Sequence, residues 1–197
     1  MQEHTETGLA PREGVEDDAD LMRKIATGDQ KSFQRLLRRH LAKTVRLASR
    51  MLGGHSAAAE DVAQEAFIKI WQHAGDFEDP EKAGARFTTW LYKIVLHLCI
   101  DEKRKRSFSG IDDIEEPHDG KDSAETGLQR QEQSAKVRGA LDALPPRQRA
   151  ALVLCFYEDY SNKEAAEMMG IGLKALEALL VRARRDLRKT LAGEEVR

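Results

Sequence analysis

Cysteine and histidine clusters are missing from this chain of 197 residues, and their absence excludes several classes of site. The only two cysteines, Cys99 and Cys155, lie inside apolar segments with a helical period. We therefore expect buried free thiols rather than a disulfide or a redox pair. The six histidines are scattered, and His97 and Cys99 are two residues apart, which points them to different faces of a helix. We expect no metal site and no cofactor.

Long hydrophobic runs are also missing. No apolar stretch approaches the roughly 20 residues that a helix needs to span a bilayer. Residues 1–18 are polar and acidic, whereas a signal peptide is basic and then apolar. The content of hydrophobic residues, 41%, is ordinary for a globular protein. We therefore expect a soluble cytoplasmic protein.

Alternating runs rich in valine, isoleucine and threonine, which would predict β-strands, are absent as well. The interior prolines fall only where the apolar helical period breaks. The predicted fold class is therefore all-α, with two small helical domains joined by a flexible acidic linker. The period predicts helices at about 18–28, 31–52, 56–74, 84–106, 126–143, 145–158, 162–169 and 173–191.

The net charge is only -2, but the charges are segregated along the chain. Residues 101–106 and 182–189 are basic, whereas residues 110–125 carry seven acidic side chains against one lysine. That acidic stretch contains Pro, Gly and Ser without an apolar period, so it predicts a mobile linker. A solvated tether and an acidic strand that occupies a nucleic-acid channel are both open interpretations of it.

The predicted divisions of the chain are a disordered tail at 1–17, a first domain at 18–106, the linker at 107–128 and a second domain at 129–197.

The segment from Ser161 to Leu187 predicts two helices joined by a glycine turn. Ser161 and Glu164 would form a capping box at the start of the first helix, and Gly170 would end it. The apolar stripe predicted for the second helix is Leu173, Leu176, Leu180, Ala183 and Leu187. The side chains off that stripe are Lys174, Ala175, Glu177, Ala178, Val181, Arg182 and Arg185. A recognition helix has such a face, with base contacts near its start and phosphate contacts further along. A solvated αα-hairpin is the other interpretation.

Residues 140–188 resemble the promoter-recognising C-terminal domain of a bacterial RNA polymerase sigma factor of the extracytoplasmic-function (ECF, group 4) family. The segments "LPPRQRAALVL" and "LLVRARRDLR" correspond to that family's "LP.RQR..L.L" helix and "L.RAR..LR" ending. The resemblance implies that the seven off-stripe residues of the second helix contact the minus-35 promoter element. It also implies that the β flap of the polymerase is a partner.

A second resemblance lies in the N-terminal half, in residues 57–77. There Val62, Ala66 and Ile70 form an apolar stripe flanked by Phe67 and Trp71. The outward face carries Glu60, Asp61, Gln64, Glu65 and Lys69, and simple solvation is one interpretation of it. However, "AEDVAQEAFIKIW" resembles the sigma-family helix that docks on the clamp helices of the polymerase β′ subunit. The resemblance gives the docking role to Asp61, Gln64 and Glu65, which would pair with arginines of the partner.

Residues 86–106, "RFTTWLYKIVLHLCIDEKRKR", combine apolar residues with cations. The predicted core residues are Trp90, Leu91, Ile94, Leu98 and Ile100. Separating DNA strands requires a cationic track for phosphates and a pocket for an unstacked base. The segment resembles the sigma-family element that binds and melts the minus-10 promoter element, and residues 77–86 correspond to its base-capturing loop. The residues implied are Thr88, Thr89, Trp90, Lys93, His97, Lys103, Arg104 and Arg106. Core packing is the other interpretation of Trp90.

Two resemblances in the expected order identify the chain as a member of the ECF sigma factors. Such a protein would bind core RNA polymerase, direct it to promoter DNA and help to open the duplex, and an anti-sigma factor is a further implied partner. We expect no enzyme, because the sequence offers no nucleophile, phosphate loop or metal constellation. A helix-turn-helix regulator that acts without polymerase would leave the N-terminal motifs unexplained. A helical adaptor without a DNA role would leave the basic clusters unexplained.

Overall fold

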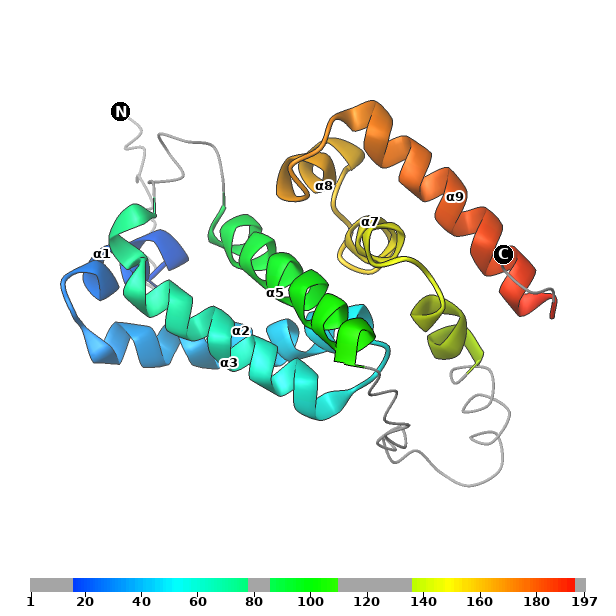
Figure 1. Cartoon of the computed structure of the whole chain (residues 1–197). Coiled ribbons are helices and arrows are strands. Elements are labelled where there is room, and N and C mark those ends of the chain that lie inside the picture. The colour runs from blue at the N-terminus through cyan, green and yellow to red at the C-terminus, as the bar shows by residue number, and fades with distance from the viewer. Residues whose placement is uncertain (1–15, 78–85, 110–135, 194–197) are drawn as a thin grey trace, which may run out of the picture.

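The computed structural model describes residues 16–77, 86–109 and 136–193. We call the described residues up to 109 the N-terminal half and those from 136 the C-terminal half. The N-terminal half contains α1 (Asp18–Ala26), α2 (Gln30–Met51), α3 (Ser56–Gln72), the 3-10 turn η1 (Ala74–Asp76) and α5 (Phe87–Ser109). The C-terminal half contains a helical stretch at 136–142, α7 (Pro146–Phe156), α8 (Asn162–Met168) and α9 (Leu173–Leu191). Helices account for the regular structure of these ranges, which confirms the all-α prediction (Figure 1).

The helices begin and end within a few residues of the predicted positions. The helix predicted at 126–143 is described only from residue 136. Three predicted features fall largely or wholly outside the described residues: the N-terminal tail, the acidic linker and the base-capturing loop. Within the ranges that the structure describes, no helix is both long enough and apolar enough to cross a membrane.

Side-chain caps explain where several helices begin. The carboxylate of Asp17 accepts a hydrogen bond from the Asp20 backbone N–H at 2.7 Å, and the carboxylate of Asp29 accepts one from the Lys31 backbone N–H at 2.9 Å. At α8 the predicted capping box is confirmed. The Glu164 backbone N–H donates to Ser161 Oγ at 3.3 Å, and the Ser161 backbone N–H donates to Glu164 Oε2 at 2.9 Å. The Ser161 hydroxyl also donates to Glu164 Oε2 at 2.7 Å, and this bond, together with the one from the Ser161 backbone N–H, holds the pKa of Glu164 below its usual value.

Removing the α8 cap provides a first test of this local structure. Ser161→Ala is expected to lower the free energy of unfolding by about 1 kcal/mol, because the Glu164 backbone N–H loses its acceptor. Chemical denaturation measures this change. Ser56→Ala is the matched control, because α3 begins without a side-chain cap bond and the expected change is under about 0.5 kcal/mol. Equal losses in the two variants would contradict the capping role of Ser161.

The N-terminal half is a helical bundle with a tightly packed core. Its fully buried residues include Leu21, Leu36, Leu47, Ile70 and Leu91, which come from α1, α2, α3 and α5. The predicted stripe of α3 is confirmed: Val62, Ala66, Phe67 and Ile70 are buried, and Trp71 is half-buried against the core. This packing leaves the opposite face of α3 open to solvent.

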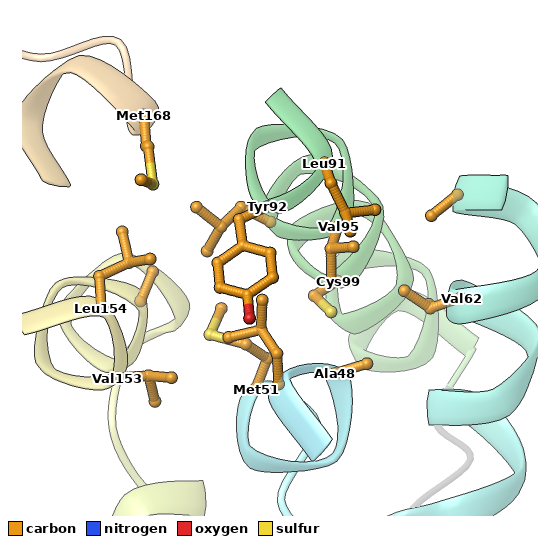
Figure 2. Packing of buried hydrophobic residues seen from close by; sticks show 14 of the residues in the cluster. Ala48, Met51, Val62, Leu91, Tyr92, Val95, Cys99, Val153, Leu154 and Met168 are labelled. Carbon is orange, nitrogen blue, oxygen red and sulfur yellow. The ribbon is translucent and has the colours of Figure 1, made fainter. Parts of the chain in front are cut away.

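Helix α5 is buried on two sides, which the sequence did not predict. Its buried residues are Phe87, Leu91, Tyr92, Val95, Leu96 and Cys99. Of the predicted core residues only Leu91 belongs to this set, whereas Trp90, Ile94, Leu98 and Ile100 are half-buried. The reason is that α5 packs on α3 and α2 of the bundle and also on α7 and α8 of the C-terminal half. Figure 2 shows Cys99 on the side of Val62, and Tyr92 on the side of Leu154 and Met168.

The two halves share one continuous hydrophobic cluster. It includes Met51 of α2, Tyr92 of α5, Val153 and Leu154 of α7, and Met168 of α8 (Figure 2). Burial in this cluster raises the pKa of the Cys99 thiol to about 12, which keeps it protonated near neutral pH. The prediction of a buried free thiol is confirmed for Cys99. Cys155 is also free, but it is only half-buried.

Candidate nucleic-acid and polymerase interfaces

Helices α8 and α9 form a helix-turn-helix unit. Gly170 has a φ of +62°, a left-handed conformation that glycine adopts without strain, and it ends α8. The Ile171 backbone N–H then donates to the Ala166 carbonyl at 3.0 Å, which closes the turn. Ala165 and Ala166 are buried where α8 packs on its neighbours. Small side chains at this contact allow α9 to cross close to α8.

The predicted minus-35 face of α9 is open to solvent along its length. Leu176, Leu180 and Ala183 are buried on the opposite side, and Leu187 is half-buried. The prediction that Leu173 belongs to the buried stripe is wrong, because this residue is 45% exposed. It is the first residue of α9, and side chains in a helix point back toward the N-terminus, so it extends past the helix end. The exposed residues include all seven predicted to contact DNA: Lys174, Ala175, Glu177, Ala178, Val181, Arg182 and Arg185.

The three arginines in the middle of α9 have different surroundings. The guanidinium of Arg184 lies 4.9 Å from the ring centroid of Phe156 on α7, so it is directed toward the body of the C-terminal half. Arg185 Nε donates to Asp186 Oδ1 at 3.0 Å. Arg182 is exposed on the same face as Val181. The cationic side chains best placed for phosphates are therefore Arg182 and Arg185.

One of the predicted docking residues of α3, Gln64, lines an apolar groove. Asp61, Gln64 and Glu65 are exposed, and Glu65 forms an ion pair of 3.5 Å with Lys69. The neighbouring groove has a volume of about 850 Å³ and runs between α2 and α3. Its lining residues are Phe33, Leu37, Arg38, Leu41, Ala42, Val45, Glu60, Gln64, Phe67 and Ile68. The sequence pattern did not predict this groove, although Ile68 lies off the predicted apolar stripe of α3 and is 47% exposed.

The eight residues implied in minus-10 binding do not share one face of α5. Lys93, His97 and Arg104 are exposed, and Thr89 and Trp90 are half-buried. Successive helical residues are 100° apart, so these five lie along one edge of α5. Trp90 packs there on Phe77 and Phe87, with ring centroids 5.5 and 6.4 Å away.

The other three implied residues of α5 lie toward a different side. Lys103 faces the C-terminal half, where its Nζ donates to Asp142 Oδ1 at 2.7 Å. Thr88 lines a cavity together with Tyr160. Arg106 is half-buried on the same side of the helix as Thr88, since 18 residues make five full turns. Two of the implied residues therefore contact or line the boundary between the halves.

A helix-turn-helix with an exposed, arginine-bearing second helix defines a DNA-binding transcription protein. Family comparison narrows this class. The model of Sigma-70 region 2 matches residues 36–108, and the model of Sigma-70, region 4 matches residues 134–187. The chain belongs to the sigma-70 family, within its extracytoplasmic-function group. Proteins of this family are transcription initiation factors and not enzymes, and a polymerase-independent regulator is not favoured.

Curated relatives agree with this assignment. The chain is 32% identical over 174 residues to ECF RNA polymerase sigma factor SigE of Mycolicibacterium smegmatis. This match covers 85% of this chain but only 65% of SigE. It is 31% identical over 185 residues to RNA polymerase sigma factor NccH of Alcaligenes xylosoxydans xylosoxydans, with 91% of this chain and 97% of NccH covered. Among solved structures, CnrH of Cupriavidus metallidurans in complex with the cytosolic domain of CnrY matches with a TM-score of 0.63. That match has 26% identity and covers 90% of this chain and 99% of CnrH.

Proposed function

We propose that this chain binds core RNA polymerase in the cytoplasm, directs it to specific promoters and assists promoter opening. The observation that carries the proposal is the exposed face of α3. Gln64 lines an apolar groove there, in which Leu41 is 40% exposed and Ile68 47% exposed, and Asp61 and Glu65 are exposed on the same helix. An apolar surface rimmed by charges is typical of a protein-binding site. We propose that the β′ clamp helices of the polymerase occupy it.

The remaining sites follow the two halves of the chain. In this proposal residues 18–106 form the unit that binds polymerase and the minus-10 element, and residues 129–197 form the unit that binds the minus-35 element and the β flap. Residues 107–128 connect them. Thr89, Trp90, Lys93, His97 and Arg104 lie on one edge of α5, which supports a role for that edge in holding a displaced strand.

We further propose an anti-sigma factor as a partner. The solved relative CnrH is bound to the cytosolic domain of CnrY, which is a property of that pair. This chain has similar folding units and presents its α3 groove to solvent. A protein that covers this groove would compete with core polymerase.

Charge reversal on α3 tests the proposed polymerase site. Asp61→Lys and Glu65→Lys should each change the free energy of unfolding by no more than about 0.5 kcal/mol, because both side chains are exposed and the Glu65–Lys69 pair is a surface pair. The double variant should bind fluorescently labelled core polymerase at least about tenfold more weakly, since rim charges steer and orient the complex.

A matched control separates docking from general charge effects. Glu167→Lys changes the net charge as much as either single α3 variant does. It reverses an exposed acid on α8, in the other half of the chain, and should leave core polymerase affinity unchanged. A large loss of stability in the α3 variants together with normal polymerase binding would show that Asp61 and Glu65 are structural residues.

A further inference from the structure

Three aromatic side chains meet at the start of α5, beside the edge that is proposed to hold a displaced DNA strand. We call Phe77, Phe87 and Trp90 the aromatic cluster. The ring centroids of Phe77 and Phe87 lie 6.1 Å apart, and each ring also contacts Trp90. Phe87 is buried, whereas Trp90 is half-buried and reaches solvent. The orientation of the Trp90 ring therefore depends on how firmly Phe87 is held.

A buried histidine of α2 packs on this cluster. His40 is only 6% exposed, and its ring centroid lies 5.0 Å from that of Phe87. His40 Nε2 lies 2.9 Å from Asp18 Oδ2 of α1. A carboxylate only accepts hydrogen bonds, so Nε2 carries the hydrogen and donates it. The imidazole cannot turn without losing this hydrogen bond, and it therefore presents a fixed ring face to Phe87.

The carboxylate of Asp18 is itself held by α2 through both oxygens. Oδ2 accepts from His40, and Oδ1 accepts from Arg39 Nη1 at 2.6 Å. Burial acts to raise the pKa of Asp18, but the hydrogen bonds and charges of His40 and Arg39 outweigh it and lower that pKa. Asp18 thus stays an acceptor near neutral pH, and it fixes the position of the His40 ring.

Helix α1 reaches the aromatic cluster by a second route. It packs on η1, the 3-10 turn that directly precedes Phe77. Ala74 of η1 is buried. The same short helix therefore braces Phe87 through Asp18 and His40, and Phe77 through η1.

We propose that Asp18 and His40 are positioning residues for strand capture, which hold Phe87 and, through it, the Trp90 ring in the orientation that stacks on an unpaired base. The proposal deepens the proposed function, on which it rests. A leucine at position 40 would fill the site without burying a polar group, so what the histidine adds is a fixed orientation. An aromatic ring that is already held in place stacks on a base without a further loss of side-chain freedom.

Tryptophan fluorescence tests the positioning role directly in the full chain. The chain has two tryptophans, and Trp71 contacts Phe33 outside the aromatic cluster, so Trp71→Phe leaves Trp90 as the only reporter. In this background His40→Leu should raise the acrylamide quenching constant of Trp90 at least about 1.5-fold, because the ring loses the packing that limits its motion. His40→Tyr supplies a ring and a hydroxyl donor, and it should restore the quenching of the parent chain.

Two matched controls separate positioning from a general loss of stability. The buried Thr44 of α2 donates through Oγ1 to the His40 carbonyl at 2.9 Å, so Thr44→Val removes a buried hydrogen bond but leaves the His40 ring in place. Asp18→Asn should raise the quenching of Trp90. Asp20→Asn removes the same charge from α1, but Asp20 pairs with Arg23 of its own helix. Both controls should leave the quenching unchanged.

Strand capture is measured with the chain bound to core RNA polymerase, using core polymerase alone as the blank. The probe is a fluorescein-labelled single strand of about 15 nucleotides, followed by anisotropy. His40→Leu should bind it at least about fivefold more weakly, near the lower end of what one base–aromatic stack contributes. In a Trp90→Ala background His40→Leu should cause no further loss, because both residues act through one ring.

The outcomes separate the positioning role from the proposed function. If His40→Leu and Asp18→Asn leave the quenching of Trp90 unchanged, or if the losses from His40→Leu and Trp90→Ala add, the positioning role is overturned while polymerase binding through α3 stands. If Trp90→Ala binds the strand as tightly as the parent chain, the strand-holding role of this edge of α5 fails, and the positioning role fails with it.

Discussion

Arg149→Ala is expected to lower the free energy of unfolding by about 2–4 kcal/mol, whereas Arg147→Ala should change it by less than about 0.5 kcal/mol. Arg149 has 0% exposure, although it carries a guanidinium. Its Nη1 donates to the Met51 carbonyl of α2 at 2.8 Å, and its Nη2 donates to the Asp142 carbonyl. Alanine would take this donor from the buried Met51 carbonyl and would open a cavity between the halves, while Lys103 Nζ would still donate to the Asp142 carbonyl at 3.1 Å.

The size of the loss is limited by the partner that remains. Asp142 has a side chain that is 40% exposed and keeps its ion pair with Lys103, so it is not left as an isolated buried charge. The effect should therefore be smaller than that of breaking a fully buried ion pair, about 3–5 kcal/mol. Burial lowers the pKa of Arg149, and Asp142 acts in the opposite direction, so the guanidinium remains charged at any pH used for folding.

Urea denaturation of three variants measures the prediction. Arg147 is exposed on the same helix, two residues before Arg149, and is the matched control. Arg149→Lys keeps the charge but lacks the planar fork that reaches both Met51 and Asp142, so its loss of stability should lie between those of Arg149→Ala and Arg147→Ala. Equal losses in Arg147→Ala and Arg149→Ala would show that the buried guanidinium does not hold the halves together.

Local features of the fold were predictable from the sequence because their signals are local. The capping box of α8, the glycine that ends it and the apolar period of α9 each lie within a few residues of one another. The same holds for the buried stripe of α3 and its exposed docking face. Leu173 fits the apolar period of α9 but is exposed. It is the first residue of the helix, so no earlier helical turn lies beneath its side chain.

The contacts between the halves could not be predicted in this way. Arg50 and Glu158 are 108 residues apart, and Arg149 and Met51 are 98 residues apart, so no periodic pattern connects them. An arginine within the apolar run of α7 was visible in the sequence, but nothing distinguished buried Arg149 from exposed Arg147. The same contacts explain α5, whose second buried side exists only because α7 and α8 pack there.

Substitutions along α9 should separate base reading from phosphate binding. Lys174 and Glu177 are exposed in the first two turns of α9. Lys174→Ala and Glu177→Ala should change the preference for a matched minus-35 duplex over a scrambled one. The expected change is about 1–3 kcal/mol for each contact between a side chain and a base that is lost. Arg182 and Arg185 lie further along the helix. Their replacement by alanine should weaken binding to both duplexes alike and reduce the log–log salt slope by about 0.9 for each phosphate that is no longer neutralised.

Duplex binding by the full chain, measured across a salt series, tests both roles, because α9 remains exposed when the halves are in contact. Arg184→Ala is the matched control for the arginines. Its guanidinium stacks on Phe156, so this variant should reduce the salt slope less than Arg182→Ala does. The guanidinium of Arg185 is paired with Asp186, so the reduction of the salt slope in Arg185→Ala should lie between those in Arg184→Ala and Arg182→Ala. If Lys174→Ala and Glu177→Ala weaken both duplexes equally, α9 contacts only the DNA backbone and the base-reading assignment is wrong.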